Sequence, residues 1–467
     1  MHLSHFKRFT LLTAASAAIS GFALTPTDSV TLNLDSCLRI ALDKSPTLQV
    51  ADLEVKRVDY SRKDVLAQLL PTVSFGATYN RMLAKQVAYM NMSRFPGAGG
   101  SDDGSGDNDS DGADKSSGDT GIKMGLDNSF QLGFQASVPV IAPQLWQSLK
   151  LSDAQIAQTV EQARASRLDL INSVKTAYYA YLLAVDSRRV IGDSYEMAAL
   201  THKIYKDRHA AGDASDYDVL RTSVAMKNVE PEMLQADIAI KQARLQLMVL
   251  MGVDVTAPFR FSGCLADYES TMYSDALALG DDYSLNTTLR QNELQTKTLE
   301  QTLRVRRMAW YPTLSLSGSY NWTSSSDGSP FKNFRWNPYS VVGLTLNVPL
   351  FQGGSRYNGV KQAEIQVAQS LLNREDLERS VATQVELARD NIVLNVKQIA
   401  SSSESVGQAE KAHSIMQQSF EIGAASYLDL RDSELSLTRS RLAYYQSIYN
   451  YLIAGAHLEL LLGSAAE

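Results

Sequence analysis

The sequence predicts a mixed α and β protein that consists mainly of long antiparallel α-helical coiled coils, with four β-strands in each chain. Three observations support this fold class. Segments of the first half recur in the second half, four segments alternate apolar and polar residues as strands do, and two stretches of more than sixty residues lack proline and follow a helical pattern. The 467 residues therefore form an internal two-fold repeat.

Matching segments define this repeat. Pro139 in the segment LGFQASVPV aligns with Pro349 in VGLTLNVPL, and these two prolines are 210 residues apart. Pro71 in LLPTVSFGATYN aligns with Pro312 in WYPTLSLSGSYN, but here the separation is 241 residues. An insertion of about 31 residues in the first copy accounts for the difference. We expect a first repeat at 24–282 and a second repeat at 283–467.

Each repeat is expected to run helix, strand, strand, long helix and return helix. No proline occurs between Gln144 and Glu230 or after Pro349, so each long helix can continue unbroken for roughly 100 Å at 1.5 Å per residue. The first repeat is expected to contain a helix at 35–69, strands at 71–80 and 129–140, a long helix at 145–209, a return helix at 215–251 and a linker at 252–282. The second is expected to contain a helix at 284–310, a hairpin at 312–350 with strands at 313–322 and 339–350, a long helix at 355–421 and a return helix at 426–462.

The four strands suit the wall of a transmembrane β-barrel, because one side of each strand is apolar and the other carries small, uncharged polar residues. Four strands cannot close a barrel, and open sheet edges leave backbone groups unpaired in a bilayer. Two copies would supply eight strands, whose lumen would be filled by side chains, whereas three copies would supply twelve strands around a pore that the helices continue as a trimeric α-barrel. The pattern therefore predicts an oligomer if the strands enter a membrane.

The net charge of −7 is concentrated in one segment. Residues 101–120 hold seven Asp and one Lys, which gives −6 and leaves −1 for the rest of the chain. Because no basic run exceeds three residues, we expect no nucleic-acid partner. The acidic loop at 97–121 includes Asp107, Asp109 and Asp111, which match the first half of a calcium-binding loop. The alternative is a solvated acidic loop that binds no metal.

The first 23 residues have the features of a secretory signal peptide, since Lys7 and Arg8 precede an apolar stretch and a cleavage site of small residues ends at Ala23. Beyond this peptide no stretch of about 18 apolar residues occurs, so no membrane-spanning helix is expected. Cys37 and Cys264 are too few for a disulfide framework. One disulfide and two free thiols both fit the sequence.

The order and spacing of these segments resemble those of the TolC-like outer-membrane efflux proteins over nearly the whole mature chain. The residues that carry the resemblance are the strand segments PTVSFGATYN and PTLSLSGSYN, the strand-to-helix junctions VPVIAP and VPLFQGG, and the opening LNLDSCLRIALDKSPTL. The resemblance implies a homotrimer in outer-membrane lipid with a shared twelve-stranded transmembrane β-barrel and a helical tunnel that extends into the periplasm. It also implies a periplasmic adaptor protein and an inner-membrane pump as partners, and a role as exit duct in tripartite efflux or type I secretion.

The resemblance further implies a gate at the second return turn. The family motif Gly-x-x-Ser/Thr-x-x-Asp-x-x-Asp corresponds here to Gly423, Ser426, Asp429 and Asp432. In the family such aspartates narrow the periplasmic entrance. Rings of carboxylates also attract cations and repel anions, so cation selectivity is expected here. A second explanation for these carboxylates is capping of the helix N-terminus, where acidic side chains are favoured in any protein. The two roles are compatible.

The first return turn offers the matching residues Gly212, Ser215 and Asp218, so Asp218 is a further candidate for the tunnel entrance. Both turns are expected to dock the adaptor. Phe420 stands where the family's best-known member has a Tyr, and Ala425 stands where it has an Arg that completes a latch. That latch is therefore absent from this sequence, although Phe420 is kept as a candidate for the tunnel entrance.

The sequence contains no catalytic motif, so we expect neither an enzyme nor a cofactor. A secreted structural or adhesive fibre of coiled coils is the alternative to a duct. A fibre predicts strict heptads and charged strand faces. The uncharged alternating strands and the polar residues within the helical seams favour the duct.

Overall fold

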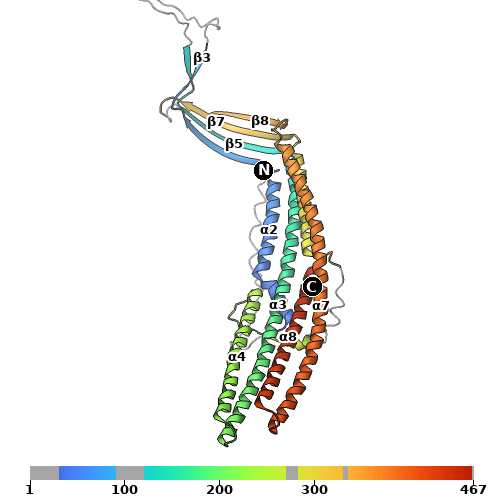
Figure 1. The fold of residues 1–467 in the computed structure, drawn as a ribbon. Helices are drawn as coiled ribbons and strands as arrows, with labels where there is room; N and C mark the ends of the chain where they lie inside the picture. Colours follow the sequence, from blue (N-terminus) through green and yellow to red (C-terminus); the bar gives the residue numbers. More distant parts are fainter. Residues whose placement is uncertain (1–30, 91–119, 270–281, 330–334, 465–467) are drawn as a thin grey trace, which may run out of the picture. The chain divides into compact units, whose positions relative to one another are not determined.

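The computed structural model describes residues 31–90, 120–269, 282–329 and 335–464 (Figure 1). The expected signal peptide at 1–23 and the calcium candidates Asp107, Asp109 and Asp111 lie outside these residues. Within the described ranges, no helix combines the length and the apolar character needed to cross a bilayer. The chain divides into two compact units that each take segments from both repeats. The sheet unit comprises Arg57–Ala157 and Gln295–Ser370, and the helical unit comprises Met1–Lys56, Gln158–Leu294 and Leu371–Glu467.

The sheet unit contains a four-stranded antiparallel sheet in the order β2-β5-β7-β8 (Figure 1). Its strands are β2 (Thr72–Arg81), β5 (Asn128–Ile141), β7 (Thr313–Ser326) and β8 (Asn337–Asn347). Each repeat supplies two neighbouring strands, and the pairing of β5 with β7 joins the repeats. The four expected strands are thus confirmed, although β7 ends four residues later than expected and β8 three residues earlier. The sheet has two open edges, at β2 and β8.

Side chains on neighbouring strands pair across the sheet. Phe75 lies opposite Phe134 with ring centroids 5.0 Å apart. Gly133 lies opposite Asn321, and a Cβ atom at residue 133 would be 2.0 Å from Asn321 Oδ1. A larger residue there would displace the Asn321 side chain, so Gly133 leaves room for this amide between the two repeats.

One end of the sheet is held by polar contacts between the repeats. Lys85 Nζ lies 3.2 Å from Asp127 Oδ1 and 2.8 Å from Asp327 Oδ1. A backbone hydrogen bond from Gly328 and the Lys85 ammonium hold the pKa of Asp127 below its usual value. A two-stranded ribbon, β3 (Gln86–Met90) and β4 (Thr120–Met124), follows this end of the sheet in the chain and was not predicted from the sequence.

The expectation of one helix at 35–69 is wrong. The structure has α1 (Leu34–Lys44) and α2 (Pro46–Ala67), separated by Ser45 in an extended conformation with φ −61° and ψ 125°. Proline disfavours the helical conformation of the residue before it, so Pro46 ends α1 and starts α2. The helix expected at 284–310 is α6 (Thr287–Met308).

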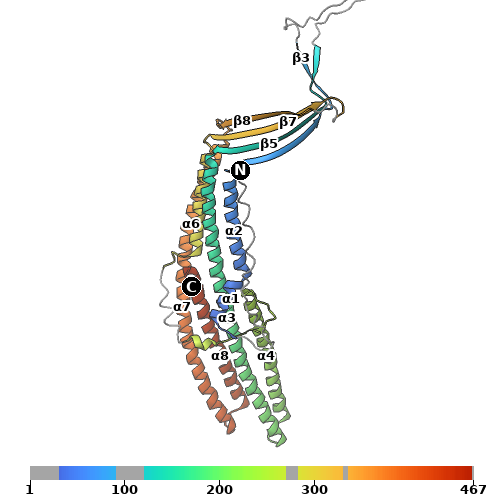
Figure 2. The same cartoon turned by 180° about the vertical axis from the view of Figure 1, so that it is seen from behind.

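Four long helices dominate the helical unit: α3 (Pro143–Ala210), α4 (Asp216–Leu250), α7 (Ser355–Glu421) and α8 (Tyr427–Leu462). Arg188 Nε lies 2.8 Å from Asp237 Oδ1 and links α3 to α4. Arg441 on α8 lies 3.3 Å from Asp193 on α3 and 2.8 Å from Glu410 on α7. The helices therefore form a layer in the order α4-α3-α8-α7, as both views show (Figure 2). Its two edges are α4 and α7.

A buried seam joins α7 to α8. A stripe of residues spaced three and four apart along α7 is buried or half-buried along its whole length. It consists of Val381, Val385, Ala388, Ile392, Asn395, Ile399, Ser402, Val406, Ala409, His413, Met416 and Phe420. Polar contacts occur within it, such as Ser402 Oγ to Ser447 Oγ at 3.0 Å, so the seam is partly polar as predicted.

The core of the helical unit lies where α3 and α8 meet α1 and the short helix η2 (Leu265–Tyr268). Leu265 and Ile448 are fully buried there, and buried Asp186 accepts a hydrogen bond from the Leu265 backbone N–H at 2.9 Å. Cys37 and Cys264 are both free thiols, so the disulfide alternative does not apply. Burial raises the pKa of the Cys37 thiol to about 12, which makes it unreactive at neutral pH.

Candidate functional site

The first return turn connects α3 to α4 at one end of the helical unit. Gly212 adopts a φ of 85°, which glycine tolerates best. Ser215 caps α4: its Oγ donates to Asp218 Oδ2 at 2.7 Å and accepts from the Asp218 backbone N–H at 3.2 Å. Hydrogen bonds from the Ser215 side chain and backbone hold the pKa of the Asp218 carboxyl below its usual value. The residues predicted at this turn thus form a capping box.

The second return turn connects α7 to α8 with the same geometry. Gly423 has a φ of 77°. Ser426 Oγ donates to Asp429 Oδ2 at 2.7 Å and accepts from the Asp429 backbone N–H at 3.2 Å. Asp429 therefore serves as a cap, whereas exposed Asp432 takes no part in the box. The two carboxylates that the sequence grouped together differ in their local roles.

Aromatic rings connect the two turns. Phe420, only 5% exposed, lies with its ring centroid 6.0 Å from that of Tyr205 on α3. Tyr205 also contacts Tyr427 on α8 at 5.6 Å, edge to face. Arg208 lies 5.3 Å from the Phe420 ring, and Arg221 lies 4.9 Å from the Tyr427 ring, both within cation–π range. We call these five residues the tip cluster.

The sequence predicted Phe420 but missed the other four members of the tip cluster. Tyr205 and Arg208 precede Gly212 by seven and four residues, so one helical face near the turn could have suggested them. The cluster forms because the second hairpin packs beside the first, which periodicity within one helix does not reveal.

Ionisable groups lie about two helical turns from the second return turn. His413 Nδ1 is 3.1 Å from Ser433 Oγ, a contact that joins α7 to α8. Glu434, 4% exposed, lies 3.3 Å from Arg431 Nη1. Burial raises the pKa of Glu434 above its usual value, and the Arg431 guanidinium opposes that shift. The matching position in the first hairpin is Ser223, which carries no charge.

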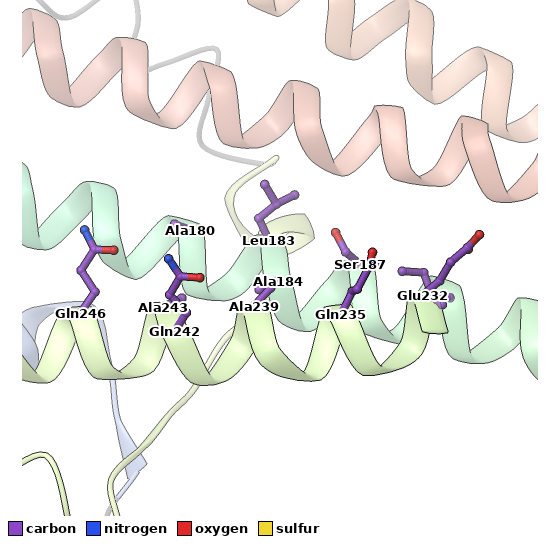
Figure 3. A pocket seen from close by; sticks show the side chains of 12 residues that line it. Ala180, Leu183, Ala184, Ser187, Glu232, Gln235, Ala239, Gln242, Ala243 and Gln246 are labelled. Atoms are coloured by element: carbon purple, nitrogen blue, oxygen red, sulfur yellow. The ribbon is translucent and has the colours of Figure 1, made fainter. Parts of the chain in front are cut away.

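A furrow of about 580 Å³ runs between α3 and α4 (Figure 3). Its floor consists of small side chains, including Ala180 and Ala184 on α3 and Ala239 on α4. Gln242 and Gln246 follow each other along α4 on its rim. Such small residues leave space because they do not fill the gap between two helices. The furrow carries one ionisable side chain, Glu232, so it lacks the converging charged groups of a catalytic site.

Comparisons with known proteins agree with this architecture. A sequence profile of the family described as Outer membrane efflux protein matches residues 37–253 and 283–464, which is most of the chain. Outer membrane protein TolC of Vibrio cholerae is 23% identical over 331 residues, covering 69% of this chain and 74% of the relative. Pyoverdine export outer membrane protein OpmQ of Pseudomonas aeruginosa is 24% identical over 437 residues, covering 92% of this chain and 85% of the relative.

The fold is also similar to solved structures. The crystal structure of the Campylobacter jejuni CmeC outer membrane channel superposes with a TM-score of 0.70 at 15% identity. The match covers 98% of this chain and 94% of that chain. The two chains therefore share a fold of long helices and a four-stranded sheet although few of their residues are identical.

Proposed function

The chain belongs to the outer membrane efflux protein family, and on this premise we propose that three copies join through the open edges of their sheets and helix layers to form one exit duct. The protein is an outer-membrane efflux channel that extends into the periplasm, so its role is transport and not catalysis. Channels of this family serve tripartite efflux and type I secretion systems. The trimer is supported by the open edges of the sheet and of the helix layer, two edges in each.

The first pair of edges belongs to the sheet. Strands β2 and β8 each have one neighbour, so their outer backbone groups lack partners within the described chain. Their apolar side chains are also uncovered: Val73 is 71% exposed, Phe75 59%, Val342 80% and Leu344 69%. Bilayer lipid covers such a face, but it cannot satisfy the backbone groups of an edge. Pairing β2 of one copy with β8 of the next satisfies both edges, and three copies close a barrel of twelve strands.

The second pair of edges belongs to the helix layer. The outer side of α4 carries large apolar residues at heptad-like spacing, each between 57% and 70% exposed. They are Tyr217, Leu220, Val224, Leu234 and Ile238. The outer side of α7 carries apolar residues at multiples of seven, between 56% and 63% exposed. They are Leu387, Leu394 and Ile415. These stripes suit knobs-into-holes packing between α4 of one copy and α7 of the next.

At the return turns we propose the entrance of the duct. In a trimer, Asp429 and Asp432 would each be present three times, and such rings of carboxylates attract cations. The tip cluster would keep the two hairpins of each copy together and the entrance narrow. We also propose that a periplasmic adaptor docks on the turns at Gly212, Ser215, Gly423 and Ser426, and that an inner-membrane pump delivers the substrate.

Mass and conductance measurements test this function. The purified mature chain in detergent is expected to have the mass of three copies, and to form ion-conducting channels in a planar bilayer. A monodisperse monomer that forms no channels would contradict the duct. Extraction from membranes by salt alone, without detergent, would support the coiled-coil fibre instead.

A further inference from the structure

A cationic pocket lies in the sheet unit, where β7 and β8 meet the end of α6 and the first turn of α7. Its volume is about 330 Å³. Arg306 and Arg356 line it together with the side-chain amides of Gln144, Asn347 and Gln352, and no acidic residue is among its lining residues. We call it the junction pocket. Two positive charges with no lining carboxylate favour an anionic ligand.

Arg356 is held in place at this pocket but is not saturated with hydrogen bonds. Its Nη1 donates to the Pro349 carbonyl at 2.8 Å and its Nε to Gln352 Oε1 at 3.0 Å. The guanidinium lies 5.6 Å from the Trp310 ring centroid. Its Nη2 is buried and has no partner within the described part of the chain. A buried donor on a charged group is costly to leave unpaired, so this atom points to a missing acceptor.

The surrounding charges do not supply that acceptor. Glu364 is already shared by Arg307 at 3.0 Å and Lys361 at 2.9 Å. Arg306 is exposed and forms no ion pair with a described residue. Helix α7 begins at Ser355, beside the pocket, and its N-terminus adds positive potential.

We propose that the junction pocket binds a phosphate group, as carried by a phospholipid headgroup. A guanidinium group has the opposite charge to phosphate and can donate hydrogen bonds to two of its oxygens at once, and amides add further donors. The source of the phosphate follows from the proposed function, on which this inference rests. The pocket lies where the strands end and the helices begin, which in an outer-membrane duct is the level of the headgroups of the periplasmic leaflet. Free phosphate offers the same chemistry from solution.

The first repeat does not offer this site. Val65 precedes Pro71 by six residues as Arg306 precedes Pro312, and Trp146 follows Pro139 by seven residues as Arg356 follows Pro349. Neither replacement is charged. The nearby cation Arg62 already pairs with Asp153. A trimer therefore has three such pockets, one in each copy.

Native mass spectrometry of the full-length mature trimer tests the proposal. The probes are dioleoylphosphatidylglycerol and dioleoylglycerol, which has the same chains without the phosphate. The parent is expected to bind up to three phosphatidylglycerol molecules in preference to dioleoylglycerol. Arg306→Gln is expected to weaken phosphatidylglycerol binding by about ten-fold, the usual size for a lost charge-assisted contact. Arg304→Gln is the matched control, because Arg304 is exposed on the same helix and does not line the pocket.

Inorganic phosphate at constant ionic strength distinguishes the two sources. Recognition of the phosphate group is supported if inorganic phosphate displaces the lipid. It is also supported if inorganic phosphate binds in an Arg306-dependent way while the lipid does not bind. Equal binding of both lipids, or equal binding by the parent, Arg306→Gln and Arg356→Gln, overturns the proposal. Conductance of the same samples separates failure of the pocket from failure of the duct. If the trimers conduct ions but their lipid binding does not depend on Arg306 or Arg356, only the pocket is rejected. If the parent is a monomer that forms no channels, the duct is rejected.

Discussion

The two helical hairpins have the same turn chemistry but different surroundings. Both turns contain a glycine with positive φ and a Ser–Asp capping box with an Oγ–Oδ2 distance of 2.7 Å. In both hairpins, a histidine of the long helix has its Nδ1 3.1 Å from a hydroxyl of the return helix. The first hairpin, however, has α4 at the edge of the layer, whereas α8 of the second hairpin lies between α3 and α7.

The difference is visible at matching positions. Phe420, three residues before Gly423, is buried against Tyr205. His209, three residues before Gly212, is 44% exposed and contacts exposed Asp216. The turn sequence therefore determines local geometry, while the position of a hairpin in the layer determines which side chains are buried between hairpins. Gating chemistry is therefore expected where Phe420 is buried between the hairpins, and intersubunit packing at the two edge helices, α4 and α7.

The largest effect is expected from the tip cluster. Phe420→Ala removes a buried ring between the hairpins and is expected to lower the free energy of unfolding by about 3 kcal/mol. It should also raise single-channel conductance, because the hairpin ends lose their contact. His209→Ala, at the matching exposed position, is expected to stay within about 0.5 kcal/mol of the parent. Thermal unfolding and bilayer recordings of both variants check this, and equal effects at the two positions would refute the difference between the hairpins.

The next effect concerns ion selectivity. Replacing both Asp429 and Asp432 by Ala is expected to lower the cation-to-anion permeability ratio a few-fold, because the two proposed rings of carboxylates are lost. Reversal potentials in a salt gradient measure this ratio. The matched control is Ser426→Ala, which removes the cap of the same helix and keeps both carboxylates. If the double variant loses stability but keeps the parent reversal potential, these aspartates act as caps only.

Glu434 should make stability depend on pH. Because burial raises its pKa in the folded state, the folded chain binds a proton more tightly than the unfolded chain. Stability from this group is therefore present at low pH and is lost as pH rises through the folded-state pKa. Glu434→Gln removes that loss and is expected to raise the free energy of unfolding by roughly 1–2 kcal/mol at neutral pH. Parent and variant should converge in acid, and a constant difference from pH 4 to 8 would contradict this account.

The smallest effect is expected from the caps. Ser215→Ala and Ser426→Ala should each cost about 1 kcal/mol, since the two capping boxes have the same geometry. Thermal unfolding of the two single variants makes the comparison. Ser215→Thr and Ser426→Thr keep a hydroxyl and should recover most of the loss. A large difference between the two alanine variants would mean that surroundings affect even this local contact.

Much of the fold was predictable because it depends on local pattern. The alternation in Val73, Phe75 and Tyr79 predicted a strand, and the absence of proline from 144 to 230 predicted a long helix. Pro46 is also evident in the sequence, but the expected helix at 35–69 ran through it, whereas α1 ends before it. The β3–β4 ribbon escaped prediction because its five-residue strands flank the insertion and are too short for a clear period.

The site was predictable only in part. Gly423, Ser426 and Asp429 were found because a capping motif is written in consecutive residues. Tyr205 and Arg221 were missed because their role depends on which hairpins are neighbours, a property of the packed layer. The order α4-α3-α8-α7 arises from side-chain matches such as Arg441 with Asp193 and Glu410, which no repeat pattern reveals.

Disulfide cross-linking between the two edges of the helix layer tests the central claim most directly. Val224 lies eight residues into α4 and Ile415 lies six residues before the end of α7, so both are roughly 10 Å from their return turns. In a Cys264→Ser background, the double variant Val224→Cys, Ile415→Cys should oxidise to covalent dimers and trimers and to nothing larger, because a closed ring ends at three copies. Each single variant should remain uncross-linked. Absence of cross-linked species, or a ladder that continues beyond three copies as in a fibre, would contradict the account.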